Sequence, residues 1–138
     1  MEDAAMEKGK RRVVVVTGAS AGLGRSIVRE VAEKGADIAL IARGIEGLEG
    51  AKREVEEAGG KALVFPIDIA DAEAVENAAA ETEAKLGPID VLVNNAMNSV
   101  FSPVKQMTAE EYKRVTEVTY LGQVYGALSA LKRMLPRD

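Results

Sequence analysis

A run of four valines that leads directly into closely spaced glycines constrains the fold of this 138-residue chain more than any other feature. The run is Val13–Val16, and the glycines that follow it are Gly18, Gly22 and Gly24. Four β-branched residues in succession are typical of a short strand that is buried on both faces. Apolar residues then recur at every fourth position, which predicts a helix that ends at Gly35. The ordered part of the chain is therefore expected to begin with a strand, a tight turn and a helix.

The same succession of strand and helix continues along the chain. Short apolar runs predict three further strands, over Asp37–Ile41, Ala62–Phe65 and Asp90–Val93. Helical spacing predicts helices over 48–58 and 71–86. A long last helix is predicted from Thr108, whose capping box includes Glu111, towards Leu135. Because strands that alternate with helices form parallel sheets with helices on both faces, we expect a three-layer α/β/α fold.

The composition excludes several classes of site. The chain has no cysteine and no histidine, so disulfides, zinc sites built from these residues and His- or Cys-based catalytic triads are excluded. A net charge of −4 gives no reason to expect nucleic acid or an anionic membrane as a partner. The basic residues within 8–12 fit either a solvated tail or a short nucleic-acid arm. No signal peptide and no membrane-spanning run are predicted, and we expect a cytoplasmic protein.

The glycine-rich turn between strand and helix is suited to the pyrophosphate of a dinucleotide. Glycines let the backbone approach the phosphates closely, and the first turn of a helix offers free N–H groups to an anion. The alternative is that these glycines serve only tight turning and close helix packing. We predict a flexible tail over 1–12 and one Rossmann-type dinucleotide-binding domain over 13–138.

Motifs at three places in the sequence give the chain a resemblance to a known family. Thr17 with the Gly-x3-Gly-x-Gly spacing, Asp68 after the third strand, and Asn94-Asn95-Ala96 after the fourth resemble motifs of the short-chain dehydrogenase/reductase family. The resemblance extends over about residues 10–138. It implies a parallel sheet with about four strands in the order 3-2-1-4, incomplete at its C-terminal side. Met97 stands where the family has a glycine. The resemblance implies an oxidoreductase that transfers hydride between a nicotinamide cofactor and an alcohol or carbonyl substrate.

The resemblance also implies roles for individual residues toward the cofactor. The positions that would surround the pyrophosphate and the adenosine ribose are Gly18, Ser20, Gly22, Leu23 and Gly24. Asp68 would face the adenine amino group, and Ile69 would lie against the adenine ring. Asn94 would brace the glycine turn through Thr17, and Ala96 would line the cofactor groove. Alternatively, Asp68 caps the following helix and Asn94 satisfies the end of a strand.

The end of the second predicted strand indicates which nicotinamide cofactor is preferred. NAD-binding proteins often have an acidic residue there, which binds the ribose 2′-hydroxyl, whereas an arginine accommodates the 2′-phosphate of NADP. In this chain Ala42 occupies the acidic position, and Arg43 follows it. We therefore predict that NADP(H) is favoured over NAD(H). The alternative is that Arg43 is only a solvated loop residue.

The tyrosine and lysine that the family uses for proton transfer are missing from this sequence. None of the three tyrosines is followed four residues later by lysine. The family also has an active-site asparagine three residues before a glycine of the long helix, and here Thr119 precedes Gly122 in that way. We expect that threonine does not reproduce both the donor and the carbonyl acceptor of that amide. We expect the cofactor-binding portion of such an enzyme, truncated before its catalytic residues and inactive by itself.

An incomplete sheet would leave apolar surfaces that another chain or segment can cover. The outer edge of the fourth strand and one face of the long helix would lack their cover, and an open apolar edge favours pairing. We therefore expect a homo-oligomer or a complementing C-terminal segment. Two alternatives to the oxidoreductase segment stay open: a regulatory module that binds NADP(H) without turnover, and a structural or assembly fragment.

Overall fold

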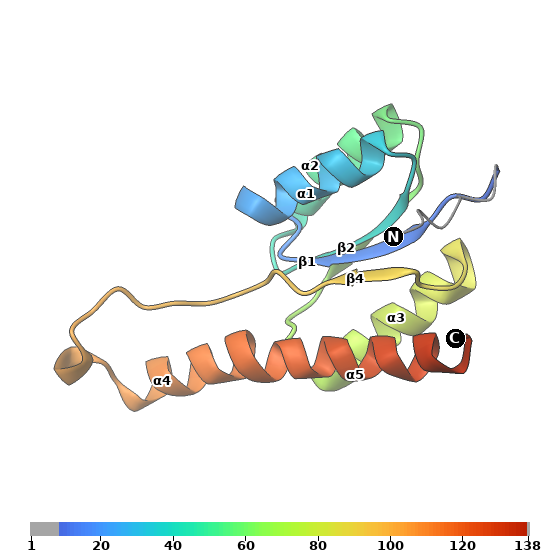
Figure 1. The fold of residues 1–138 in the computed structure, drawn as a ribbon. Coiled ribbons are helices and arrows are strands. Elements are labelled where there is room, and N and C mark those ends of the chain that lie inside the picture. The colour runs from blue at the N-terminus through green and yellow to red at the C-terminus, as the bar shows by residue number, and fades with distance from the viewer. Residues whose placement is uncertain (1–8, 138) are drawn as a thin grey trace, which may run out of the picture.

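A parallel sheet with helices on both faces forms the body of the protein (Figure 1). The computed structural model describes residues 9–137. The four strands are β1 (Val13–Thr17), β2 (Asp37–Ala42), β3 (Ala62–Pro66) and β4 (Val91–Val93). All three pairings between neighbouring strands are parallel, and the strand order is β3-β2-β1-β4. The predicted three-layer fold with the strand order 3-2-1-4 is confirmed.

The valine run forms the central strand because its side chains feed two separate cores. Val14 and Val16 pack with helices α1 (Gly22–Glu33) and α2 (Ile45–Glu57). Val13 and Val15 pack on the other face, where helices α3 (Ala72–Leu86) and α5 (Gly122–Met134) lie (Figure 1). Side chains alternate between the two faces of a sheet, so a strand covered on both faces is apolar at every position. Every residue of β1 is buried.

The last helix is not the single regular helix that the spacing predicts. It consists of α4 (Ala109–Val115), a π-helical turn (Thr116–Leu121), α5 and a closing 3-10 turn (Leu135–Arg137). Gly122 lies directly after the π-helical turn, where an added Cβ would come within 2.7 Å of Ile69 Cδ1. The π turn adds one residue to the helix at this point of close approach. The spacing of apolar residues in the sequence does not predict such an insertion.

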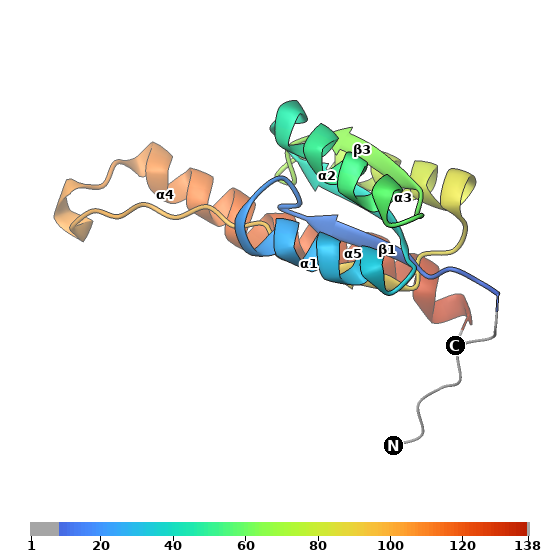
Figure 2. The ribbon, with the colours of Figure 1, turned by 90° about the horizontal axis from the view of Figure 1, so that it is seen from above.

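The start of this helix follows the prediction. The Thr108 hydroxyl accepts a hydrogen bond from the Glu111 backbone N–H at 3.2 Å, and the Glu111 carboxylate accepts one from the Thr108 N–H at 2.8 Å. The predicted capping box is therefore confirmed. α4 and the segment before it, which contains a 3-10 turn at Val104–Gln106, project away from the sheet (Figure 2).

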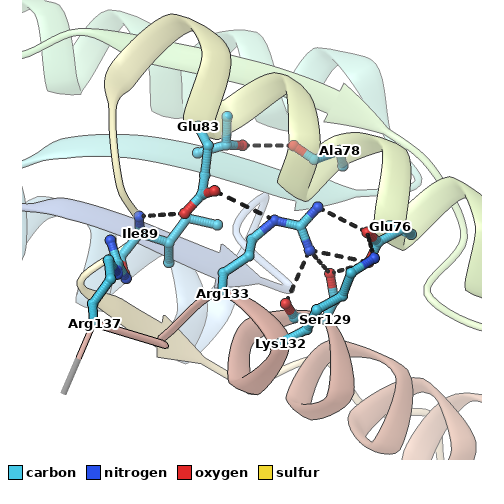
Figure 3. Close-up of polar contacts among 9 residues, drawn as sticks. Glu76, Ala78, Glu83, Ile89, Ser129, Lys132, Arg133 and Arg137 are labelled. Atoms are coloured by element: carbon cyan, nitrogen blue, oxygen red, sulfur yellow. Dashed lines mark hydrogen bonds and ion pairs between the residues drawn. The ribbon is translucent and has the colours of Figure 1, made fainter. Parts of the chain in front are cut away.

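A cluster of polar side chains ties α5 to α3 (Figure 3). The Glu76 carboxylate accepts hydrogen bonds from Ser129 Oγ at 2.8 Å, Lys132 Nζ at 2.9 Å and Arg133 Nη2 at 2.8 Å. On its other side, Arg133 Nε lies 3.6 Å from a carboxylate oxygen of Glu83. The Arg133 guanidinium, followed by the Lys132 ammonium, lowers the pKa of Glu76 to about 2. The two helices are therefore joined by charge as well as by apolar packing.

The expected N-terminal tail is only partly described. Residues 1–8 lie outside the described residues. Arg11 is anchored rather than free, because its side chain donates to the Asp37 carboxylate at 2.9 Å and to the Ala36 carbonyl at 3.2 Å. No helix within residues 9–137 is both long enough and apolar enough to cross a membrane.

Candidate functional site

A cavity of about 520 Å³ opens where the strands end. Its walls come from the segments that follow all four strands and from the last helix. The lining residues are Gly18, Ser20, Leu23, Ala42, Arg43, Gly44, Ile67, Asp68, Ile69, Asn95, Ala96, Met97, Asn98, Arg114 and Val118. β1 has β2 on one side and β4 on the other, so the strand order reverses here. Ligands of open α/β sheets bind at the carboxyl ends of the strands at such a reversal.

At each glycine of the turn after β1, either the backbone conformation or the space available favours glycine. Gly18 and Gly22 have φ angles of +69° and +56°, a region that residues with a side chain rarely adopt. A Cβ on Gly24 would lie 2.0 Å from the Gly18 carbonyl oxygen. Gly24 is thus needed for the backbone of the turn to pack against itself, whereas a Cβ on Gly18 would lie 2.7 Å from Asn95 Nδ2 in the segment after β4. The resulting turn leads directly into α1.

The N-terminus of α1 has the features of an anion site. Ala21 is its N-cap residue, no side chain caps the helix, and its first turn has no acidic residue. By contrast, α3 and α4 are capped by Asp71 and Thr108. The N–H groups of an uncapped first turn, together with the helix dipole, favour a bound anion. Since Ser20 and Leu23 of this turn line the cavity, the site fits a pyrophosphate group.

Thr17 and Asn95 hold the ends of β1 and β4 together. The Thr17 hydroxyl accepts hydrogen bonds from the backbone N–H groups of Asn95 and Ala96, both at 3.0 Å. The Asn95 side-chain amide donates to the Thr17 carbonyl at 3.1 Å. The residue that braces the glycine turn is therefore Asn95, and the expectation that Asn94 does so through Thr17 is wrong.

Asn94 turns to the opposite side of the sheet. Its side-chain amide donates to the Gln123 carbonyl of α5 at 3.0 Å, and its buried Oδ1 has no hydrogen-bond partner among the described residues. Successive side chains of an extended chain point in opposite directions, so two adjacent asparagines reach different neighbours. The sequence alone does not indicate which of the two faces the turn.

Asp68 forms an ion pair across the cavity. Its Oδ2 accepts a hydrogen bond from Arg114 Nη1 at 2.7 Å, and its Oδ1 accepts one from the Ala70 N–H at 2.9 Å. The bond from Arg114 keeps the pKa of Asp68 below its ordinary value, and the Ala70 N–H and the charge of Arg43 act in the same direction. The N-cap of α3 is Asp71, which accepts from the Ala74 N–H at 3.0 Å, so Asp68 is not the capping residue.

Thr119 lies in the π-helical turn and contacts the chain after β4. Its hydroxyl accepts a hydrogen bond from the Asn98 N–H at 2.9 Å and donates one to the Asn98 carbonyl at 2.8 Å. One hydroxyl therefore acts as both donor and acceptor toward the backbone of Asn98. Because Asn98 lines the cavity, Thr119 fixes part of the wall without lining it.

Most of the predicted cofactor-binding residues come together at the cavity. Those that line it are Gly18, Ser20, Leu23, Arg43, Asp68, Ile69 and Ala96. Gly22, Gly24 and Asn94 are not among the lining residues. The sequence analysis did not predict that Arg114 and Val118 line the cavity. The two residues lie one helical turn apart in the last helix, far from Asp68 in sequence. Their spacing of four residues indicates that they share one face of a helix. Nothing in the sequence indicated that this helix face packs near Asp68.

Comparison with known proteins gives consistent matches. Residues 12–138 match the family described as short chain dehydrogenase. A fatty acyl-CoA reductase of Acinetobacter baylyi is 34% identical over 133 residues, which cover 95% of this chain and 45% of that protein. The structure of NAD+-bound xylitol dehydrogenase is similar with a TM-score of 0.88 and 30% identity, over 95% of this chain and 51% of the other.

A second solved structure was determined with a different cofactor. A blue fluorescent protein from a metagenomic library, in complex with NADPH, has a TM-score of 0.82 and 32% identity, over 89% of this chain and 51% of the other. The chain thus spans less than half the length of the curated relative and about half that of the two solved structures.

Proposed function

The chain belongs to the short-chain dehydrogenase family, whose members bind nicotinamide cofactors, and from this we propose that it is the NADP(H)-binding segment of an oxidoreductase. The observation that carries the proposal is the uncapped N-terminus of α1, which opens into a cavity where the strand order reverses. The complete protein would act on an alcohol or carbonyl substrate. When bound, the cofactor supplies or accepts the hydride.

In this proposal each part of the cofactor is bound by a different group of cavity residues. The turn from Gly18 to Gly24 and the first turn of α1 hold the pyrophosphate by backbone N–H groups, and Ser20 adds a hydroxyl. Asp68 accepts a hydrogen bond from the adenine amino group, and Ile69 packs against the adenine ring. Ala96 lines the groove towards the nicotinamide. Residues 13–138 form one cofactor-binding domain.

Arg43 supports a preference for NADP(H). It lines the cavity directly after β2, and the preceding residue, Ala42, has no carboxylate to repel a phosphate. A guanidinium matches the geometry of phosphate oxygens and forms strong charge-assisted hydrogen bonds. The similar folds of an NAD+-bound and an NADPH-bound protein mean that the fold alone does not decide between the cofactors.

We further propose that this chain binds the cofactor without catalysing hydride transfer. No tyrosine in it is followed by a lysine four residues later, so it lacks the pair whose lysine lowers the pKa of the phenol.

An open edge and an exposed helix face support a partner. Among residues 9–137, β4 pairs only with β1, and its three residues are only partly buried. On α5, Leu128 and Leu131 are 61% and 47% exposed. We propose that a second copy of the chain or a complementing C-terminal segment covers these surfaces.

A fluorescence titration with NADPH and with NADH tests the cofactor proposal. We expect NADPH to bind more tightly by about tenfold or more, because only NADPH offers a phosphate to Arg43. Tighter binding of NADH would overturn the preference. If neither cofactor binds, the chain is not a cofactor-binding segment, and the assembly fragment becomes the better description.

A further inference from the structure

Arg114 is the residue by which the projecting helix α4 reaches back to the cavity. It lies at the end of α4, one turn before the buried Val118, and both residues line the cavity. The rest of α4 extends away from the sheet (Figure 2). The Arg114 side chain is 29% exposed, and Nη1 lies 2.7 Å from Asp68 Oδ2. A residue distant in sequence is thereby brought to the base of the loop that follows β3.

The Asp68 carboxylate is held at both of its oxygens. Oδ1 accepts from the Ala70 N–H, within the same loop, and Oδ2 accepts from Arg114. Two hydrogen bonds to different oxygens fix the rotation of the carboxylate about its Cβ–Cγ bond. Each oxygen has a second lone pair, and the Asp68 side chain is 37% exposed. The carboxylate can therefore accept a further hydrogen bond from a ligand in a set direction.

We propose that Arg114 is a positioning residue that orients Asp68 to accept the 6-amino group of adenine, and that it thereby determines the selectivity for adenine over hypoxanthine. The inference rests on the proposed function, in which Asp68 faces the adenine. Hypoxanthine carries a carbonyl oxygen in place of the 6-amino group. That oxygen cannot donate to the carboxylate, and it repels a carboxylate that is held towards it.

Removal of Arg114 frees the carboxylate to turn away. The penalty against hypoxanthine then falls, because Asp68 is no longer held against the carbonyl oxygen. The bond to adenine also weakens, because the carboxylate must be ordered when the ligand binds. Both changes reduce the ratio of the two affinities, whereas a role limited to anchoring α4 lowers both affinities by the same factor.

The test measures dissociation constants of the full chain for NADPH and for its analogue with hypoxanthine in place of adenine. The variants are R114M and R114Q, which remove the charge, and R114K, which keeps it. K113M is the matched control, because Lys113 lies next to Arg114 on α4, has a 76% exposed side chain and faces Glu117. Circular dichroism checks that each variant is folded.

We expect the wild-type chain and K113M to prefer NADPH over the analogue by about tenfold or more, the scale of a hydrogen bond to a charged group. R114M and R114Q should reduce this preference to less than about threefold, with R114K intermediate because a lysine offers a single donor point. If R114M does not fold, R114Q carries the same prediction.

Three results would count against the inference in distinguishable ways. An unchanged ratio in R114M and R114Q, even with weaker binding of both ligands, means that Arg114 only anchors α4. A wild-type chain that binds both ligands equally overturns the role of Asp68 toward the amino group, and the inference with it. A wild-type chain that does not bind NADPH overturns the proposed function itself.

Discussion

At the scale of single residues, the cavity depends on side chains that hold backbone groups. Thr17 is the clearest case, because its hydroxyl accepts from two consecutive backbone N–H groups, those of Asn95 and Ala96. Thr17 is buried, so water does not replace these bonds if the hydroxyl is lost. The junction of β1 and β4, and with it one wall of the cavity, should therefore be sensitive to this one oxygen atom.

Thr17→Val keeps the shape of the side chain and removes the hydroxyl. We expect a loss of about 1–2 kcal/mol in the free energy of unfolding, because the Ala96 N–H loses its acceptor and the Asn95 N–H keeps only the Val93 carbonyl at 3.1 Å. Urea denaturation measures this loss. Thr116→Val is the control, since its exposed hydroxyl bonds only to the Tyr112 carbonyl within the helix. Equal effects of the two substitutions would contradict the role of Thr17.

Arg43→Ala tests the proposed contact between a single residue, Arg43, and the 2′-phosphate of NADPH. We expect NADPH to bind about tenfold more weakly while the affinity for NADH stays within about twofold, because only NADPH loses a charged hydrogen-bond partner. Titration with both cofactors measures the change. Arg53→Ala serves as the control, since Arg53 is an exposed arginine of α2 outside the cavity lining. A preference for NADPH that survives in Arg43→Ala would show that another group binds the phosphate.

At the scale of elements, α3 and α5 are joined by a charge cluster whose strength depends on pH. Glu76 has a pKa lowered from 4.5 to about 2 by Arg133, Lys132 and Ser129. A carboxyl group whose pKa is lower in the folded state contributes stability above its unfolded pKa. That contribution is lost as the pH falls from about 4.5 to about 2. Because the Glu76 side chain is 37% exposed, we discount it for solvent screening to about 1 kcal/mol.

Glu76→Gln should therefore flatten the dependence of stability on pH between about 5 and 2. At pH 7 it should cost about 1–2 kcal/mol, because the largely buried Arg133 loses its main partner. Thermal unfolding over a series of pH values gives both quantities. Glu73→Gln is the control, since Glu73 is exposed on the same helix. If the wild type and Glu76→Gln lose stability in parallel as the pH falls, the cluster does not couple the helices.

At the scale of the whole molecule, the sheet is covered unevenly. Two helices cover each face, while β4 has an open outer edge within the described residues, and α5 leaves large apolar side chains exposed. Open edges and contiguous apolar faces favour association. The proposed partner would cover the open edge of β4, the exposed face of α5, or both.

Sedimentation velocity at micromolar concentration tests this association. We expect the wild-type chain to form dimers or larger species, and Leu128→Asp to reduce them by placing a charge on the exposed face of α5. Phe101→Asp is the control, because Phe101 is fully exposed on the segment before α4. A stable wild-type monomer would contradict self-association and leave a complementing segment as the proposed partner.

The sequence by itself determined the order of the strands and the helices and the place of the site. The valine run indicated a strand buried on both faces, and the capping box at Thr108 was correct, because both patterns depend on neighbouring residues. The motifs with their order along the chain also indicated the 3-2-1-4 sheet and seven residues of the cavity lining. The valine run and the capping box are local features, whereas the strand order and the cavity residues were implied by the resemblance to the short-chain dehydrogenase/reductase family.

Only the tertiary structure decided which side chains meet across the site. Thr17 is bonded to Asn95, 78 residues away, and Asp68 to Arg114, 46 residues away. The choice of Asn95 over Asn94, the π turn that presents Thr119 to Asn98, and the cluster at Glu76 all depend on how packed elements face each other. Contacts of this kind are set by the relative rotation and approach of packed elements, which a pattern within one segment does not encode.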